Sequence, residues 1–176
     1  TVGSCKTKLE YLADSAKSFI DVLSVASPQS RVGLVFFNSE VETIAPQSLT
    51  DSNVAELKNK LDNMSGIVRD GTNNVTALNA CQELLGSLGD ENDNQHIASL
   101  GVNNITLVSD QLKNENIKTF CLGAFYSKSA LIAGEAFLKS LDSSYRLMEG
   151  CKKLPEYLVP IADEIVNPKR SVVKFN

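Results

Sequence analysis

Residues 31–46 read RVGLVFFNSEVETIAP, and this stretch decides the fold class. Its first half, residues 31–37, is almost continuously apolar, which is typical of a strand buried on both faces of a sheet. Asn38 and Ser39 then supply a tight turn. Residues 40–45 alternate polar and apolar side chains, as an edge strand does when one face is solvated. The stretch therefore predicts a buried strand that a hairpin joins to an antiparallel edge strand.

A helix is predicted on the N-terminal side of this hairpin. Thr7 and Glu10 have the spacing of a capping box, in which the threonine hydroxyl and the glutamate satisfy the first free backbone N–H groups. The helix should end by Pro28, because proline does not continue a helix. Apolar residues recur at helical spacing between these limits and predict one buried face: Leu9, Leu12, Ala13, Ala16, Phe19, Ile20 and Leu23.

Helices and apolar strands alternate along the rest of the chain. A second helix follows Thr50 or Asp51, either of which can cap it. A third helix follows residue 74 and should end by Gly89, with six residues facing inward: Val75, Leu78, Cys81, Leu84, Leu85 and Leu88. The remaining predicted strands are residues 105–110, 117–124 and 145–148, and the remaining predicted helices are residues 130–141 and 154–166.

This alternation predicts an α/β fold: a three-layer, doubly wound, mostly parallel sheet with one antiparallel edge strand and helices on both faces. We expect one domain over residues 1–166 and a basic C-terminal extension over residues 167–176. Two features depart from the usual pattern. No strand is predicted before the first helix, and the eight residues between Asp110 and Thr119 are fewer than a parallel crossover needs.

The composition excludes some classes of function. A net charge of −4 and a pI near 5.1 leave no basic footprint for nucleic acid or for an acidic membrane surface. No apolar run approaches the roughly 20 residues of a membrane span, and no signal peptide is visible. With 176 residues the chain is long enough to bury a core of its own.

The cysteines and the single histidine offer little for catalysis. The four cysteines include no pair at two-residue spacing, so they form no metal motif. We expect Cys81 and Cys121 to be buried thiols, whereas Cys5 and Cys151 lie in polar stretches and could form disulfides in an oxidising compartment. His96 is predicted to lie in a polar loop, where it serves neither catalysis nor metal binding.

A candidate site begins at Gly71, Thr72 and Asn73, directly before the third helix. Glycine allows a sharp turn, and a threonine hydroxyl at a helix N-terminus can cap the helix, hold an anion or bind a metal ion. Asp110 closes a predicted strand. Ligands of open α/β sheets bind beyond the carboxyl ends of the strands, so Asp110 and Thr72 are candidates for one site.

Taken together, these pieces resemble a von Willebrand factor A domain, the I domain of integrins and many adhesins. The resemblance covers nearly the whole chain and rests on the order of its pieces. In chain order these are KLEYLADSAKSFIDVL, RVGLVFFNSEVETIAP, DGTNNVTALNACQELL, NNITLVSD, LKNENIKTFCLGAF and LKSLDSSYRLMEG.

The resemblance implies a metal-ion-dependent adhesion site for Mg²⁺, or for Mn²⁺ or Ca²⁺. In the family, an Asp-x-Ser-x-Ser motif, a threonine and an aspartate supply the oxygen ligands that such hard cations prefer. Thr72 matches the threonine and Asp110 the aspartate, and Ser4 matches the second serine if VGSC stands where the family has SGSM. On that alignment Val2 replaces the first serine, and the leading aspartate is not in the sequence. Two alternatives therefore stay open: the full first motif lies upstream of Thr1 and the metal site works, or the pocket is degenerate and keeps the fold but not the ion.

The leading expectation is a non-enzymatic protein-binding or adhesion module. Its top face would bind a protein, matrix or receptor partner through an acidic residue, with an extracellular or cell-surface setting such as an adhesin or pilus subunit. Val2 favours the alternative, a metal-independent scaffold of an intracellular multiprotein complex. A nucleotide-binding enzyme is disfavoured, because the sequence has neither Gly-x-Gly-x-x-Gly nor Gly-x-x-x-x-Gly-Lys-Ser/Thr and no nucleophile paired with a base.

Overall fold

The computed structural model describes residues 6–67, 74–86, 96–100, 118–125, 127–141, 145–149 and 152–167. Six of its elements are helical: α1 (Lys8–Ala26), α2 (Asp51–Asp62), the 3₁₀ helix η1 (Met64–Ile67), α3 (Asn74–Gly86), α5 (Lys128–Leu141) and α6 (Leu154–Val166). The strands are β1 (Arg31–Phe37), β2 (Val41–Ser48), β3 (His96–Leu100), β4 (Lys118–Phe125) and β5 (Arg146–Glu149). Helices and strands thus alternate as the sequence predicts.

The strands pair in the predicted senses. β1 and β2 form an antiparallel hairpin, in which Phe37 pairs with Val41 and Arg31 with Ser48. β3, β4 and β5 are parallel neighbours in that order. Among the described strands, the hairpin β1–β2 and the group β3–β4–β5 are paired within themselves, and none of these strands pairs with members of both groups.

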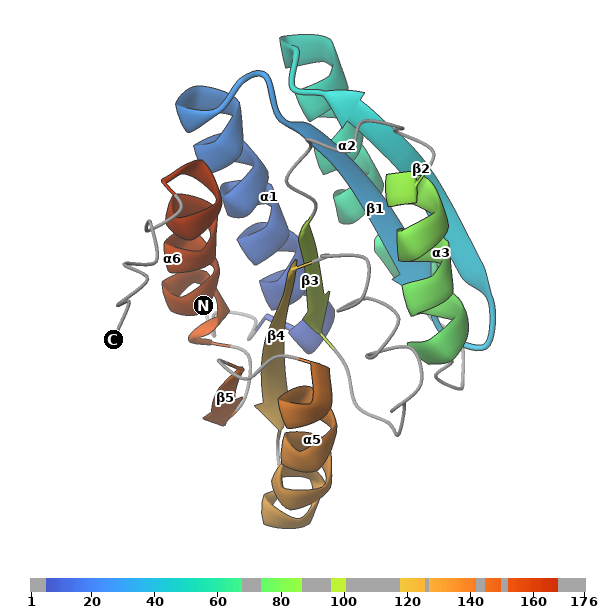
Figure 1. Cartoon of the computed structure of the whole chain (residues 1–176), viewed down its shortest axis with the longest axis vertical. Helices are drawn as coiled ribbons and strands as arrows, with labels where there is room; N and C mark the ends of the chain where they lie inside the picture. The colour runs from blue at the N-terminus through green and yellow to red at the C-terminus, as the bar shows by residue number, and fades with distance from the viewer. Residues whose placement is uncertain are drawn as a thin grey trace, which may run out of the picture.

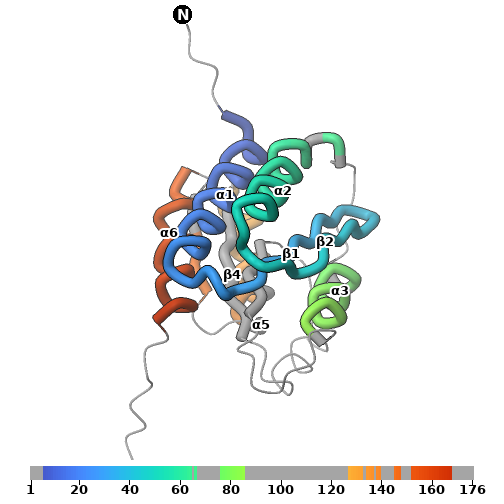
Figure 2. The backbone as a smooth tube through the Cα atoms, turned by 90° about the horizontal axis from the view of Figure 1, so that it is seen from above, coloured from blue at the N-terminus to red at the C-terminus, as the bar shows by residue number. Residues whose placement is uncertain are grey.

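The helices cover both sides of the strands, in a three-layer α/β arrangement. α1 packs between α2 and α6, and α3 packs on the β1–β2 hairpin. Seen from above, α2 and α3 lie on opposite sides of that hairpin (Figure 2). The strands β3 and β4 point toward the end of the molecule at which α1 and α3 begin (Figure 1). The carboxyl ends of these parallel strands and the N-termini of these two helices therefore share one end of the fold.

The capping box at the start of α1 is confirmed. The Glu10 N–H donates to the Thr7 hydroxyl at 3.2 Å, and the Thr7 N–H donates to Glu10 Oε2 at 2.5 Å. Thr50, not Asp51, caps α2 by accepting a hydrogen bond from the Asn53 N–H at 3.3 Å. Both helices therefore begin where local hydrogen bonding alone would start them.

The main core lies between α1, α2, α6 and the hairpin. Its most buried side chains are Ile20 of α1, Leu57 of α2 and Ala162 of α6, against which Leu34 and Phe36 of β1 pack. Burying one such aliphatic side chain contributes about 1.5–3 kcal/mol. The predicted inner face of α1 is thus the surface on which the three helices and the hairpin meet.

Two expectations about the hairpin need correction. Residues 32–37 are predicted to be buried on both faces, but they are only half-buried and Arg31 is exposed, because the burial of each face depends on the helices that pack on it. The second strand runs on past residue 45 to Ser48. Pro46 is tolerated within it because the register shifts between Val32 and Leu34, and proline, which has no N–H to donate, suits such a bulge.

The position predicted for His96 is wrong. His96 is the first residue of β3 and pairs with Lys118 of β4, so the partner strand overrides the local polar sequence. The third helix is described over Asn74–Gly86, and its predicted end at Gly89 lies outside the described residues. Leu78 is buried in it as expected, and so is Ala77, which the apolar pattern did not single out. The predicted strand 105–110 and residues 168–176 lie outside the described residues, and the boundary between domain and extension stays a prediction.

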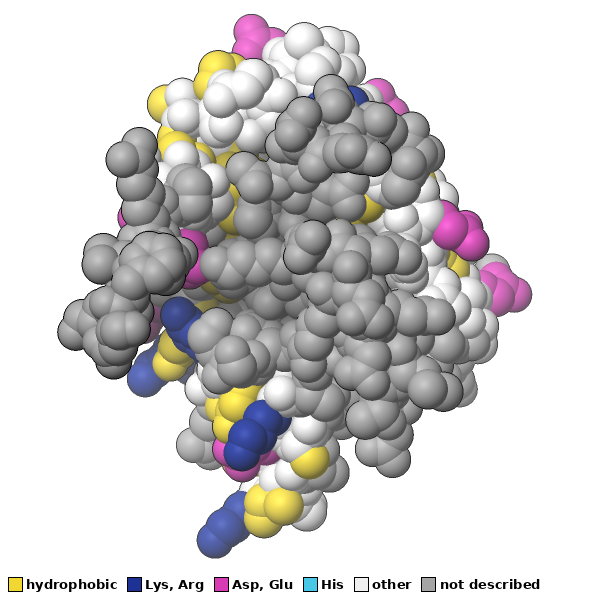
Figure 3. Space-filling model, viewed as in Figure 1, with side chains coloured by type: hydrophobic (Ala, Val, Ile, Leu, Met, Phe, Trp, Pro, Cys, Tyr) yellow, Lys and Arg dark blue, Asp and Glu magenta, His cyan; other side chains and the backbone are white. Residues whose placement is uncertain are grey.

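The described surface carries both signs of charge. On the face seen in Figure 3, Asp and Glu side chains lie along the side of the hairpin, whereas Lys and Arg side chains gather toward the end that carries α5. Within the described residues, no helix combines the length and hydropathy that crossing a membrane requires.

Candidate functional site

The three predicted metal ligands, Ser4, Thr72 and Asp110, lie outside the described residues, as does Val2. Their mutual geometry stays a prediction. Chain connectivity nevertheless limits the position of two of them, because two residues span at most about 7 Å. Ser4 is two residues from Lys6, and Thr72 is two residues from Asn74, the first residue of α3. In the sequence, both therefore lie close to the starts of α1 and α3, and these two helix starts share one end of the fold (Figure 1).

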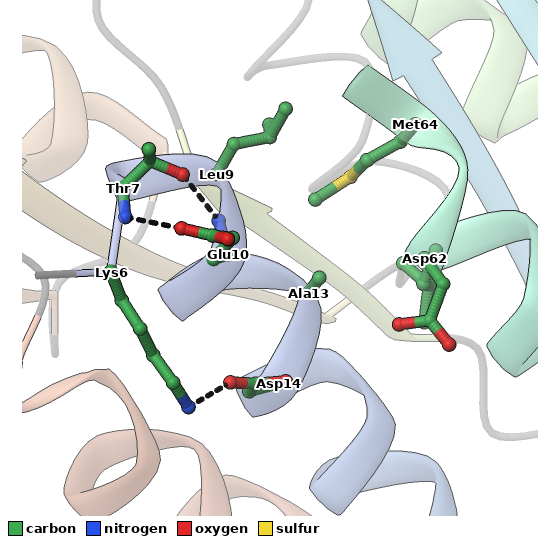
Figure 4. A pocket seen from close by; sticks show the side chains of 9 residues that line it. Lys6, Thr7, Leu9, Glu10, Ala13, Asp14, Asp62 and Met64 are labelled. Carbon is green, nitrogen blue, oxygen red and sulfur yellow. Dashed lines mark hydrogen bonds and ion pairs between the residues drawn. The ribbon is translucent and has the colours of Figure 1, made fainter. Parts of the chain in front are cut away.

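A cavity opens at this end, between the first turns of α1 and the corner where α2 passes into η1. We call it the α1–η1 pocket; its volume is about 560 Å³. Its floor is apolar and consists of Leu9, Ala13, Leu61 and Met64. The last three are buried, with 7%, 4% and 6% of their surface exposed. Leu9 and Met64 extend into the same space from opposite sides (Figure 4).

The rim of the α1–η1 pocket is charged, and its charges form a chain of ion pairs. Lys6 Nζ lies 2.5 Å from Asp14 Oδ2, and Lys17 Nζ lies 3.3 Å from Asp14 Oδ1 and 2.5 Å from Asp62 Oδ1. The chain thereby ties the first turns of α1 to the last residue of α2. Glu10 completes the rim through the capping box described above.

These contacts shift the pKa values of the rim side chains: those of the carboxyl groups fall and that of the lysine rises. The hydrogen bond from Lys6, followed by that from Lys17, lowers the pKa of Asp14 below its ordinary value of 3.8. The hydrogen bond to Asp62 raises the pKa of Lys17. For Glu10, the hydrogen bond from the Thr7 backbone lowers the carboxyl pKa. All these groups are charged at neutral pH, and solvent screens their interactions because they lie at the surface.

The described residues do not themselves assemble a metal centre. Among them, no group of three or more His, Cys, Asp or Glu side chains is placed to hold an ion. Ser4, Thr72 and Asp110 stay the predicted ligands, and their hydroxyls and carboxylate suit a hard cation.

Cys81 of α3 is the one predicted thiol whose side chain the structure describes. It is a free cysteine of intermediate exposure. Burial raises its pKa to about 11, so the thiol is protonated at neutral pH and is a poor nucleophile. Cys121 lies in β4 as predicted, and Cys5 and Cys151 lie outside the described residues.

The pattern of the sequence did not reveal the α1–η1 pocket. Asp14 and Lys17 are three residues apart on α1 and could have been found from helical spacing, whereas Lys6 precedes the helix and is eight residues from Asp14. Asp62 is 45 residues from Lys17, and only the packing of α2 against α1 brings the two together.

These features define a class of protein: a doubly wound α/β domain whose candidate site lies where α1 and α3 begin. The sequence model of the von Willebrand factor type A domain matches residues 2–112. This match includes 111 of the 176 residues, and the chain therefore belongs to the von Willebrand factor type A domain family. No curated protein matches the chain.

Solved structures agree with the fold. Proximal thread matrix protein 1 from the mussel byssus superimposes with a TM-score of 0.71 at 16% identity, covering 90% of this chain and 42% of its own. BatB from Bacteroides thetaiotaomicron gives 0.68 at 14% identity, covering 89% of this chain and 86% of its own. The SpRpn10 VWA domain gives 0.61 at 14% identity, covering 85% of this chain and 81% of its own. The chain thus spans less than half of the byssus protein, and at these identities the likeness shows the fold alone.

Proposed function

We propose that this chain is a non-enzymatic protein-binding module that engages its partner at the end of the fold where α1 and α3 begin. The family membership supports a role in protein interaction. The observation that carries the proposal is the common end shared by these two helix N-termini and the carboxyl ends of β3 and β4 (Figure 1). In open α/β sheets this is the end at which ligands bind.

The chemistry of that end favours an acidic group on the partner. The N-terminus of a helix carries a partial positive charge and free N–H groups, both of which attract a carboxylate. We propose further that Ser4, Thr72 and Asp110 hold a Mg²⁺ ion, whose open coordination position the partner's carboxylate would fill. The ion would supply a Lewis acid for binding, and this chain's residues would orient it.

The setting that we propose is extracellular or at a cell surface. The resemblance to the adhesin members of the family is what favours this setting. A second candidate is a metal-independent scaffold in an intracellular complex. Val2, which offers no oxygen where the family has a serine, favours that candidate.

A calorimetric titration with Mg²⁺ and Mn²⁺ tests the metal site. We expect the wild-type protein to bind one divalent ion, and Thr72→Ala and Asp110→Ala each to weaken or abolish binding. Thr43→Ala and Asp51→Ala are the matched controls, because both residues are exposed on other elements, β2 and the start of α2. If the wild-type protein binds no ion at millimolar concentration, the proposed metal site is rejected and the metal-independent scaffold is favoured.

A further inference from the structure

We propose that the α1–η1 pocket accepts an apolar side chain of the partner together with an adjacent lysine or arginine. The pocket would then be the second contact of a partner whose carboxylate binds beside Ser4. The carboxylate contact beside Ser4 rests on the proposed function. The preference of the pocket for an apolar and a basic side chain rests on the described side chains alone.

The floor of the pocket favours an apolar group. Leu9 is half-buried and extends into the pocket, whereas Ala13, Leu61 and Met64 belong to the main core and keep only 4–7% of their surface exposed (Figure 4). A volume of about 560 Å³ lies in the range of small-ligand pockets and exceeds the needs of one leucine-sized side chain. Methionine is unbranched and polarisable, so Met64 can adapt to whichever apolar side chain enters.

The rim favours a cation beside that apolar group. Among the described residues that line the pocket, Glu10, Asp14 and Asp62 supply three carboxylates and Lys6 supplies one ammonium group, so these four side chains carry a net charge of −2. Lys17, which pairs with Asp14 and Asp62, reduces this to −1. A carboxylate offers about four acceptor positions, so Asp62 can accept a hydrogen bond from a partner's lysine or arginine while it keeps Lys17.

The position of the pocket makes it reachable from the proposed binding face. Lys6 lies on the rim and only two residues from Ser4, at most about 7 Å along the chain. A peptide segment that places a carboxylate next to Ser4 can therefore place a neighbouring side chain in the pocket. The partner expected here carries an acidic residue close to an apolar–basic pair.

The two methionines of the chain provide a direct test. Selective ¹³C labelling of methionine methyl groups gives one signal from Met64, in the pocket, and one from Met148, in β5. The substitution Met64→Leu assigns the signals. The probe is the synthetic peptide acetyl-Gly-Leu-Arg-Gly-amide, with acetyl-Gly-Leu-Glu-Gly-amide and acetyl-Gly-Ala-Arg-Gly-amide as counterparts.

We expect the Leu-Arg peptide to shift the Met64 signal in a saturable way and to leave the Met148 signal in place. The Leu-Glu and Ala-Arg peptides should bind more weakly. Asp62→Asn should weaken binding of the Leu-Arg peptide about two- to fivefold, in keeping with one exposed ion pair. Asp51→Asn, at the opposite end of α2, should leave the affinity unchanged.

The inference is overturned if the Met64 signal does not move at millimolar peptide, if the Leu-Glu peptide shifts it as strongly, or if Asp51→Asn weakens binding as much as Asp62→Asn. The result is independent of the metal site, because the peptide titration is run without divalent ions. A shifted Met64 signal in a protein that binds no Mg²⁺ would support the peptide-binding pocket and reject the proposed metal site. Mg²⁺ binding without a shift of the Met64 signal would support the metal site and reject the pocket proposal.

Discussion

Lys17 Nζ of α1 lies 2.5 Å from Asp62 Oδ1 at the end of α2, and the two residues are 45 positions apart in the sequence. Asp14 extends this contact toward Lys6 at the start of α1. The rim of the α1–η1 pocket is thus held from both of its walls by one chain of charges. This arrangement gives the first two predictions.

Lys17→Ala should lower the free energy of unfolding by less than about 1 kcal/mol, because exposed ion pairs contribute little in water. Urea unfolding at low salt measures the loss. The difference from wild type should shrink in 1 M NaCl, where the screening length falls to about 3 Å. Lys152→Ala is the control, since Lys152 is exposed and lies just before α6. An undiminished difference at high salt would show that Lys17 stabilises by packing and not by charge.

The stabilising effect of Asp14 should depend on pH. Its pKa is lower in the folded protein than its ordinary value of 3.8, so ionised Asp14 stabilises the fold. This contribution is complete above pH 3.8 and is lost as the pH falls through the lowered pKa. Asp14→Asn should therefore destabilise the protein at pH 7 and match the wild type at the acid end. Unfolding curves between pH 2.5 and 7 test this, and a difference that grows toward acid pH would contradict it.

Gly33→Ala should destabilise the hairpin by about 1–3 kcal/mol, the usual cost of overpacking. A Cβ atom at Gly33 would lie 2.8 Å from the Ile44 carbonyl oxygen and 3.0 Å from the Pro46 nitrogen, so the two strands would have to separate. Gly66→Ala is the matched control, because a Cβ there meets nothing within 4 Å. The midpoint of urea unfolding measures both variants, and equal effects would show that the close approach is not what matters.

Thr7→Ala should cost about 1 kcal/mol, because the Glu10 N–H loses its acceptor at the start of α1. Thr7→Ser keeps a hydroxyl and should recover most of that stability. Hydrogen exchange of the first turn of α1 measures where the loss falls. We expect faster exchange there and unchanged exchange in α6; a uniform increase would instead point to a global loss of stability.

The sequence by itself determined the features that depend on near neighbours. The capping box, the end of α1, the turn at Asn38 and the antiparallel sense of the hairpin all follow from residues within a few positions of one another, and all are present. These features could be predicted because their hydrogen bonds and side-chain alternation involve one helical turn or one strand, so no contact with a distant segment has to be known.

Only the tertiary structure decided the features that need a partner from elsewhere in the chain. His96 lies in a strand because β4 pairs with it, and Asp62 meets Lys17 because α2 packs on α1. The half-burial of β1 depends on the helices that cover its faces. Burial and ion pairing depend on contacts between distant segments, and a local pattern carries no information on which segments meet. The α1–η1 pocket belongs to this second class, whereas Thr72 and Asp110 were proposed from the sequence and the family resemblance alone.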